Sequence, residues 1–325
     1  MKNKKIFITG VAGFIGFHLA NYFLKKKGFS IFGIDNLNNY YSVALKNKRL
    51  SILQKNKNFF FKKVELENKK ILKDTIKSFK PYLIINLAAQ PGVRYSYIRP
   101  DIYLRYNLNG FINLLEVMSE LKLTKLIYAS SSSVYGDAIN FPTNEKSELK
   151  PLNLYGETKV INEKIAQIYT KYCNINSFGL RFFTAYGSLG RPDMMISKSI
   201  NKIKKREIIN LYNNGKHTRD FTHVLDIIEI IFILSKKINS FKGHELFNIC
   251  SNNKIKLIYL IKSLEKLLKL KPITKNIKKQ KGDMLNTLGD NKKIKNFSKK
   301  KKFINFDFGL KETIENDTKW AKFKK

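Results

Sequence analysis

Apolar runs and amphipathic segments alternate along the first half of the chain. The apolar runs that predict buried strands are Lys5–Thr9, Ser30–Ile34, Phe59–Phe61, Leu83–Asn86, Lys125–Ala129 and Ile175–Leu180. The segments that predict helices are Phe14–Lys26, Leu45–Lys55, Lys69–Phe79, Tyr103–Leu121 and Tyr155–Tyr172. Strands buried on both faces read as continuous apolar runs, and their alternation with helices is typical of a parallel sheet. Because crossovers are right-handed, we expect an α/β fold with a Rossmann-type doubly wound parallel sheet.

Beyond residue 182 the pattern is less regular. Helices are predicted over Ile196–Arg206, Asp226–Lys237, Lys256–Leu268 and Lys311–Phe323, and a strand over Ile208–Tyr212. No sharp linker separates the two parts of the chain. We therefore expect a Rossmann domain over residues 1–181, with a returning segment near residues 222–250, and a smaller C-terminal domain over residues 182–325.

The charge balance of the chain is strongly basic. It has 62 basic and 25 acidic residues, which gives a formal net charge of +37. Only eight of the basic residues are arginine, and the joint abundance of lysine, asparagine and isoleucine is what coding DNA rich in A and T would produce. No cluster of lysines interleaved with aromatic residues marks a nucleic-acid motif, so we do not expect specific binding to nucleic acid.

Cysteine and histidine usage argues against a disulfide scaffold and a metal site. Cys173 and Cys250 form no Cys-x-x-Cys pair, and the four histidines lack the i, i+4 spacing of a helical metal site. Ile6–Leu24 is largely apolar, as in a signal peptide, but glycines at fixed spacing favour a strand–turn–helix over a membrane span. We expect a reducing, cytoplasmic location without membrane insertion and without a bound metal.

A glycine-rich turn follows the first predicted strand. Residues 9–16 read TGVAGFIG, and Gly10, Gly13 and Gly16 precede a helical pattern. Glycine lets the backbone approach a diphosphate closely, and the following helix N-terminus supplies free N–H groups and a positive dipole. Asp35 ends the second predicted strand, where a carboxylate accepts hydrogen bonds from the hydroxyls of an adenosine ribose and repels a 2′-phosphate. These features predict a dinucleotide site that prefers NAD to NADP.

A tyrosine and a lysine four residues apart form the candidate catalytic pair. Tyr-x-x-x-Lys begins at Tyr22, Tyr155 and Tyr212, about as often as chance predicts, so position must decide among them. Only Tyr155 opens a predicted helix and follows a polar apex, Ser130–Ser133, at the end of the fifth predicted strand. Lys159 lies on the same helix face, and its ammonium together with a cationic nicotinamide ring lowers the pKa of the phenol from its ordinary value of about 10. A serine hydroxyl at the apex can relay the proton or orient the substrate oxygen.

Several motifs together resemble the extended short-chain dehydrogenases/reductases. They are the glycines of the 9–16 turn, Asp35-Asn36, Ala88-Ala89, Asn107-x-x-Gly110 and Tyr155-x-x-x-Lys159. Longer strings are similar to the UDP-glucuronate 4-epimerases within that family, and the resemblance extends over nearly the whole chain. These strings are DNLNNYY (residues 35–41), AAQPGVRYS (88–96), SSSSVYG (130–136), LRFFTAYG (180–187), GRPDM (190–194) and RDFT (219–222).

The resemblance implies an NAD-binding Rossmann domain followed by a nucleotide-sugar-binding domain, and it assigns roles to individual residues. Ser131, Tyr155 and Lys159 match the catalytic set. An arginine facing the sugar could meet a uronate carboxylate in bidentate fashion. The cofactor positions are Gly10, Gly13, Phe14, Ile15, Gly16, Asp35, Asn36, Glu65, Leu66, Leu87, Ala88, Ala89, Asn107, Tyr155 and Lys159. Thr184 and Arg191 match positions that face the sugar, and Arg219 and Asp283 match positions that hold the UDP diphosphate and the uridine ribose. The full set of substrate positions is Arg94, Ser131, Ser132, Thr184, Arg191, Arg219 and Asp283.

The implied reaction is inversion at C4 of a UDP-hexuronate, UDP-glucuronate to UDP-galacturonate, through a transient 4-keto sugar with NAD as cofactor. A UDP-glucose or UDP-N-acetylglucosamine 4-epimerase and a UDP-glucuronate decarboxylase are the alternatives. A 4,6-dehydratase is disfavoured because Ser132-Ser133 stand where an Asp-Glu pair would be expected. Glu65 departs from the family, which usually has aspartate near the adenine. Related enzymes commonly dimerise through the helices that match Tyr103–Leu121 and Tyr155–Tyr172, so a homodimer is expected.

Overall fold

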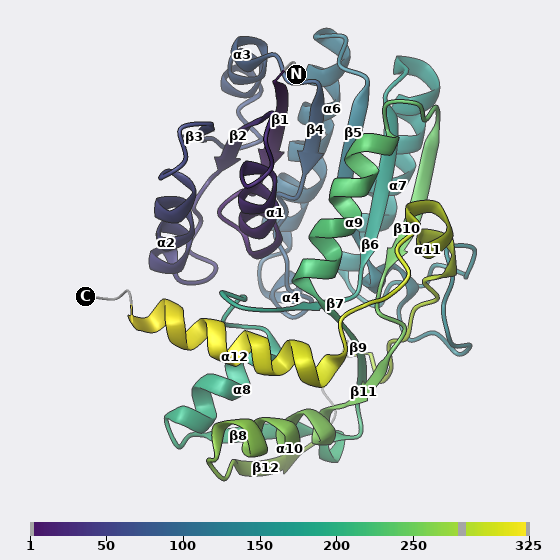
Figure 1. Cartoon of the computed structure of the whole chain (residues 1–325). Coiled ribbons are helices and arrows are strands. Elements are labelled where there is room, and N and C mark those ends of the chain that lie inside the picture. The colour runs from purple at the N-terminus through teal and green to yellow at the C-terminus, as the bar shows by residue number, and fades with distance from the viewer. Residues whose placement is uncertain (1–2, 279–283, 323–325) are drawn as a thin grey trace.

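The centre of the fold is a sheet of seven parallel strands. The computed structural model describes residues 3–278 and 284–322, and Figure 1 shows its elements. The strand order is β3-β2-β1-β4-β5-β6-β10, so the direction of winding reverses between β1 and β4. This order confirms the predicted α/β class with a Rossmann-type doubly wound parallel sheet. The strands are β1 (Lys4–Thr9), β2 (Phe29–Asp35), β3 (Phe59–Lys63), β4 (Leu83–Asn86), β5 (Lys125–Ser131), β6 (Asn176–Phe182) and β10 (His244–Ile249).

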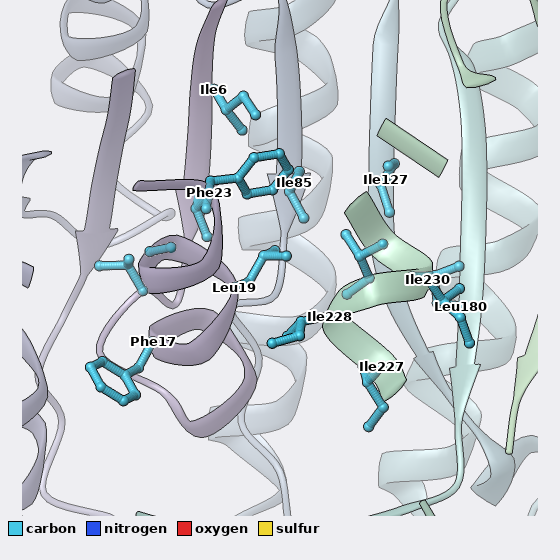
Figure 2. Packing of buried hydrophobic residues seen from close by; sticks show 14 of the residues in the cluster. Ile6, Phe17, Leu19, Phe23, Ile85, Ile127, Leu180, Ile227, Ile228 and Ile230 are labelled. Atoms are coloured by element: carbon cyan, nitrogen blue, oxygen red, sulfur yellow. The ribbon is translucent and has the colours of Figure 1, made fainter. Parts of the chain in front are cut away.

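Helices cover both faces of this sheet. On one face, α1 (Phe14–Leu24), α2 (Val43–Leu53) and α9 (Val224–Lys237) share a buried apolar cluster with the strands. Figure 2 shows side chains of α1 and α9 packed beside Ile6, Ile85 and Ile127 of the sheet. Each fully buried side chain of this size contributes roughly 1.5–3 kcal/mol to folding. On the other face lie α3 (Lys69–Phe79), α6 (Gly110–Glu120) and α7 (Leu154–Cys173).

The helix predicted over Tyr103–Leu121 is built from three pieces. After the short α4 (Tyr95–Ile98), α5 spans Pro100–Tyr103, a π-helix spans Leu104–Asn109, and α6 follows from Gly110. A π turn inserts one extra residue per turn and is frequent at functional sites. Here it directs Asn107 towards the interior, where the Asn107 side chain is buried.

The second half of the chain forms a smaller core beyond the carboxyl edge of the large sheet. A three-stranded sheet has the order β11-β9-β7, and β8 pairs in parallel with β12. The long helix α12 crosses between this part and the carboxyl ends of the large sheet (Figure 1). The bounds are β7 (Thr184–Tyr186), α8 (Met195–Lys204), β8 (Ile208–Tyr212), β9 (Thr218–His223), β11 (Lys254–Lys256), α10 (Leu257–Leu268), β12 (Ile273–Ile277), α11 (Lys292–Ser298) and α12 (Phe306–Lys322). Two single-turn 3₁₀ helices span Ser132–Tyr135 and Asn213–Gly215.

The chain passes between the two parts more than once. β9 belongs to the small sheet, whereas α9 and β10, which follow it, complete the large one. The division into residues 1–181 and 182–325, with a returning segment near 222–250, stays a prediction. Five short strands (β7, β9, β10, β11 and β12) were not expected from the sequence, and α12 begins five residues before the predicted Lys311. Strands of three to six residues carry too little alternation to be distinguished from loops.

Candidate active site

A cleft of about 730 Å³ opens at the carboxyl ends of the strands of the large sheet. Ligands of open α/β sheets bind at this place. The structure brings every predicted site residue to this cleft except Glu65, Asn107 and Asp283, and Asp283 lies outside the described residues. We call its two sides the sheet wall and the loop wall. The sheet wall comprises the 10–16 turn, Asp35, Ala88, Ser131, Tyr155 and Lys159. The loop wall comprises Thr184, Arg219 and two residues of the loop 187–193, Arg191 and Asp193.

The glycine turn of the sheet wall is closed by tight backbone packing. Gly10 has φ +68°, and a Cβ there would lie 2.8 Å from the backbone nitrogen of Ala88. A Cβ on Gly16 would overlap the carbonyl oxygen of Gly10. α1 begins at Phe14 with no side-chain cap, so its first N–H groups are available to an anion in the cleft. The turn is therefore shaped for a diphosphate.

Asp35 lies in the sheet wall at the carboxyl end of β2. Its carboxylate accepts hydrogen bonds from the backbone N–H of Ala12 (3.2 Å) and of Leu37 (2.8 Å). Burial raises the pKa of Asp35, while the nearby Lys46 ammonium and the two N–H donors oppose that rise. Lys46 is itself fixed by hydrogen bonds to the backbone and side-chain oxygens of Asn38, at 2.8 and 2.9 Å.

Tyr155 and Lys159 lie on the first two turns of α7, beside the serine apex. Asn153 caps this helix by accepting the N–H of Gly156 at 3.0 Å. A Cβ on Gly156 would lie 2.7 Å from the carbonyl oxygen of Ser133, so glycine is what lets the helix start this close to the serines. The Ser131 hydroxyl lies close enough to the Tyr155 phenol to lower its pKa, and the Lys159 ammonium lies 5.9 Å from the centre of the phenol ring.

The environment of this group adjusts two pKa values. Burial raises the pKa of Tyr155, while the nearby Ser131 hydroxyl and the positive charge of Arg191 lower it. Burial lowers the pKa of Lys159 to about 8, against the attraction of Glu163. Lys159 also donates to the backbone oxygen of Ala129 at 2.9 Å, which fixes its position. A phenol held between a hydroxyl and a cation can give or take a proton at a substrate oxygen.

A buried ion pair that the sequence analysis did not identify supports the catalytic group from behind. Glu163 accepts two hydrogen bonds from Arg181, at 2.9 and 2.7 Å, and one from Ser130 at 2.5 Å. The side chains of the pair are only 2% and 5% exposed. Glu163 lies one turn beyond Lys159, so the i, i+4, i+8 series on α7 was the signal that could have found it.

On the loop wall, Arg191 is held by an acidic neighbour. Its guanidinium makes two hydrogen bonds to Asp193, at 3.1 and 2.5 Å, and lies 5.8 Å from the ring centre of Tyr40. The Tyr40 hydroxyl donates to Asp193 at 3.3 Å. Tyr40 and Asp193 lie within the strings that carried the family resemblance, but nothing in their sequence pattern assigned them a role.

Two further arginines line the cleft beyond Arg191. Arg219 of β9 donates to the backbone oxygens of Thr218 (2.9 Å) and Leu285 (3.3 Å). The Arg94 guanidinium lies 4.8 Å from the ring centre of Tyr212 on β8, so it contacts the smaller part of the molecule. These cations at the cleft suit a ligand that carries phosphates.

Asn107 and Glu65 lie away from the cleft. The Asn107 amide accepts from the N–H of Gln90 (2.7 Å) and donates to the Gln90 oxygen (3.1 Å) and the Thr158 hydroxyl (3.2 Å). It therefore ties the loop after β4 to α7 from behind the sheet wall. Glu65 is exposed, whereas its neighbour Leu66 lines the cleft. A contact of either residue with a cofactor stays a prediction.

The comparison with known families agrees with this geometry. Residues 6–250 match the model of the NAD dependent epimerase/dehydratase family. The chain belongs to this family. Among known proteins, the chain is 35% identical over 316 residues to a UDP-glucuronate 4-epimerase of Thermodesulfobacterium geofontis, covering 97% of this chain and 95% of the relative. It is 46% identical over 228 residues to Protein CapI of Staphylococcus aureus, covering 70% of this chain and 68% of the relative.

Solved structures of the family superpose closely on this chain. The UDP-glucuronic acid 4-epimerase of Bacillus cereus, in complex with UDP-glucuronic acid and NAD, has a TM-score of 0.91 and 29% identity. The superposition covers 97% of this chain and 99% of that one.

The family's cofactor, NAD, fits the residues of the sheet wall. A Cβ at Gly10 or Gly16 would clash with backbone atoms of the turn, so only glycine allows this tight backbone path. α1 presents uncapped N–H groups, and Asp35 lies at the end of β2. Among the described residues, no group of three His, Cys, Asp or Glu side chains could hold a metal ion. Nor does any helix within the described ranges have the length and apolarity needed to cross a membrane.

Proposed function

We propose that this chain is an NAD-dependent isomerase that inverts C4 of a UDP-hexuronate, interconverting UDP-glucuronate and UDP-galacturonate. The observation that carries the proposal is the presence of two chemistries in one cleft. Ser131, Tyr155 and Lys159 can move a proton at a sugar hydroxyl, and Arg191 lies close enough to influence the Tyr155 phenol. Similarity to two UDP-glucuronate 4-epimerases supports the same substrate.

The proton step belongs to Tyr155. Its phenolate removes the proton from the 4-hydroxyl of the sugar, and the Ser131 hydroxyl orients the same oxygen. The Lys159 ammonium stabilises the phenolate by its charge. NAD, when bound, accepts the hydride from C4 and returns it to the opposite face. Between these two steps the 4-keto sugar rotates within the cleft, so that its other face is presented. Tyr155 then returns the proton to the oxygen at C4.

The uronate carboxylate is assigned to the loop wall. Arg191 keeps N–H donors beyond those that bind Asp193, and Thr184 adds a hydroxyl in the same cleft. A 4-keto uronate is a β-keto acid and loses CO₂ readily when its carboxylate is free to align with the ketone. Holding the carboxylate at Arg191 and Thr184 disfavours that alignment, which separates epimerisation from decarboxylation.

The nucleotide must stay fixed while the sugar turns. Arg219 and Arg94 bring positive charge to the cleft and are each held by neighbouring groups of the smaller part. We assign the UDP diphosphate to Arg219. Asp283, the predicted partner of the uridine ribose, lies outside the described residues.

Incubation of the purified protein with UDP-glucuronate and NAD, followed by separation of the nucleotide sugars, tests the proposal. We expect UDP-galacturonate as the product. A UDP-pentose would identify a decarboxylase instead. Turnover of UDP-glucose or UDP-N-acetylglucosamine with none of UDP-glucuronate would identify a neutral-sugar epimerase and refute the uronate assignment.

A homodimer is part of the same proposal. Exposed apolar side chains lie on α7, where Ile168 is 54% and Tyr172 is 70% exposed, and on the short helix α4, where Tyr97 is 51% exposed. A second copy of the chain would cover them if the α7 faces met. The molar mass in solution, measured by light scattering, decides between dimer and monomer.

A cytoplasmic location is proposed with it. Cys173 and Cys250 are free thiols, which suits a reducing compartment. Fractionation of cells followed by immunodetection tests this location.

A further inference from the structure

The loop that carries Arg191 contains a backbone conformation that needs support. Leu189 has φ +51°, in the left-handed region that residues other than glycine seldom adopt. Gly187 and Gly190 flank it, and the Leu189 side chain is buried in the core shared by α1 and the sheet. A non-glycine residue in this region costs on the order of 1–3 kcal/mol unless its surroundings enforce it.

Three side chains bind consecutive backbone groups of this loop. His18 Nε2 lies 2.8 Å from the Ser188 oxygen, Arg49 donates to the Leu189 oxygen at 2.6 Å, and the Leu189 N–H donates to Asp317 at 2.8 Å. Two of them come from the consecutive helices α1 and α2 in the first part of the chain, and the third comes from α12 in its last part (Figure 1). A single short loop is thus held from three directions.

The protonation state of His18 follows from its partner. Burial lowers the pKa of His18 to about 4, so the ring is neutral at pH 7. A carbonyl oxygen can only accept, so the proton of the neutral ring is on Nε2 and His18 donates to Ser188. The bond is present throughout the physiological pH range.

Arg49 joins this loop to the glycine turn. Besides Leu189, it donates to the Ala12 oxygen at 2.7 Å and to the Tyr41 hydroxyl at 2.9 Å. Its side chain is 0% exposed, and its Nε has no hydrogen-bond partner among the described residues. A buried cation with an unsatisfied donor destabilises a fold, so a role in function is a better account of Arg49 than a role in stability.

We propose that His18, Arg49 and Asp317 are positioning residues that clamp the Ser188–Leu189 backbone and thereby hold Arg191 at the sugar. Arg191 follows Leu189 by two residues, so the clamp fixes the start of the segment on which the guanidinium is mounted. Through Ala12, Arg49 also fixes the loop relative to the turn assigned to the NAD diphosphate. The clamp couples the place of the uronate to the place of the cofactor. This inference rests on the proposed function, because it gives Arg191 a substrate carboxylate to bind.

The first test compares Asp317→Ala, Asp317→Asn and Glu315→Ala in the full-length protein. Alanine removes the acceptor of the Leu189 N–H, whereas asparagine keeps an acceptor oxygen at the same position. Glu315 is a carboxylate of the same helix, 57% exposed, and serves as the control for lost charge. We expect Asp317→Ala to speed hydrogen exchange at the Leu189 amide and to raise KM for UDP-glucuronate, each about tenfold, with a smaller effect on kcat. Asp317→Asn should restore most of both, and Glu315→Ala should match the wild type.

A double-mutant cycle asks whether the effect passes through Arg191. If the clamp acts by holding this residue, Asp317→Ala should raise KM in the wild type and leave it unchanged in an Arg191→Met background. A full tenfold rise in both backgrounds would show that Asp317 acts elsewhere, and the proposal would be wrong.

Arg49→Lys tests the bridge to the glycine turn. Lysine keeps the charge, but its compact ammonium cannot reach all three oxygens that the planar guanidinium spans. We expect a higher KM for UDP-glucuronate together with weaker retention of NAD, with the melting temperature recorded beside both. Wild-type values for KM and NAD retention would overturn the assignment of Arg49.

The outcomes distinguish the clamp from the proposed function. Exchange at the Leu189 amide is measured without substrate. A wild-type protein that does not turn over UDP-glucuronate refutes the proposed function. Unchanged exchange at Leu189 in Asp317→Ala refutes the clamp, whatever the substrate.

Discussion

The two walls of the cleft are built in different ways. The sheet wall carries its chemistry at the ends of regular elements: Asp35 ends β2, Ser131 ends β5, and Tyr155 and Lys159 lie on the first turns of α7. The loop wall carries Arg191 on a loop and Thr184 at the start of a three-residue strand. Regular backbone satisfies most of its own hydrogen bonds, so fewer bonds from elsewhere in the chain are needed to hold it in place. A loop needs bonds from elsewhere in the chain to hold one position.

Asp220, the neighbour of Arg219, is a clear example of a side chain that holds loop backbone in place. Its carboxylate accepts hydrogen bonds from the N–H and hydroxyl of Ser251 (3.0 and 2.9 Å), and from the N–H groups of Asn252 (3.1 Å) and Gly289 (3.2 Å). Burial raises the pKa of Asp220 to about 6, although these donors oppose the rise. In the same way, the clamp formed by His18, Arg49 and Asp317 binds backbone groups of the loop before Arg191. The difference suggests that the sheet wall sets the reaction, and that the loop wall sets the substrate.

The largest expected effect tests the sheet wall. Tyr155→Phe removes only the hydroxyl that exchanges the proton, so kcat should fall roughly a thousandfold while NAD and UDP still bind. Tyr22→Phe is the matched control, because Tyr22 also precedes a lysine by four residues and has that lysine 5.0 Å from its ring. Epimerisation rates and ligand affinities of both variants check the prediction. Retained turnover in Tyr155→Phe would remove this residue from the mechanism.

The difference between regular elements on the sheet wall and loops on the loop wall also explains which parts of the site could be predicted from the sequence. Strand and helix periodicity in the first half placed the elements that carry Asp35, Ser131 and Tyr155, and the assignment of NAD followed from the glycine turn and Asp35. The clamp was missed because its bonds join residues 170, 140 and 128 positions apart, and no local pattern records such contacts. Roles for Thr184 and Arg191 came only from the family resemblance, not from periodicity.

The next effect concerns the ion pair behind the sheet wall. Glu163→Gln leaves the buried Arg181 without a counter-charge, so the free energy of unfolding should fall by about 3 kcal/mol. Glu116→Gln on α6, whose carboxylate is 39% exposed and pairs with Lys69, should cost far less. Denaturant unfolding of both variants measures the difference. Equal losses would mean that burial does not set the strength of the pair behind Tyr155.

A smaller effect is expected on the loop wall. Arg191→Met should raise KM for UDP-glucuronate about thirtyfold and change the affinity for UDP-glucose far less, because only the uronate offers a carboxylate. Arg99→Met is the matched control, since Arg99 binds Asp101 two residues on with the same two-bond geometry, at 3.0 and 2.9 Å, on the surface. Steady-state kinetics with both sugars decide. An equal loss for UDP-glucose would assign Arg191 to the nucleotide rather than to the carboxylate.

The smallest expected effect is a pH dependence that comes from Lys159 of the sheet wall. It should change the activity of the enzyme and the stability of the folded chain in opposite directions. The pKa of Lys159 is about 8 in the folded chain, below its ordinary value because of burial. Its ammonium is present below this pH and is lost above it, so kcat/KM should fall a few-fold as the pH rises through about 8. Stability should move the other way, because between pH 8 and the ordinary lysine pKa of 10.5 the unfolded chain binds the extra proton.

Two variants separate Lys159 from other titrating groups in that range. Glu163 raises the pKa of Lys159, so Glu163→Gln should move the alkaline fall in kcat/KM to lower pH. Lys159→Arg keeps its charge throughout the range, so this fall should disappear even though kcat is lower overall. A fall in kcat/KM that stays near pH 8 in both variants would show that a different group titrates. The ammonium would then hold Tyr155 in place without controlling its charge, and the sheet wall would depend on geometry alone.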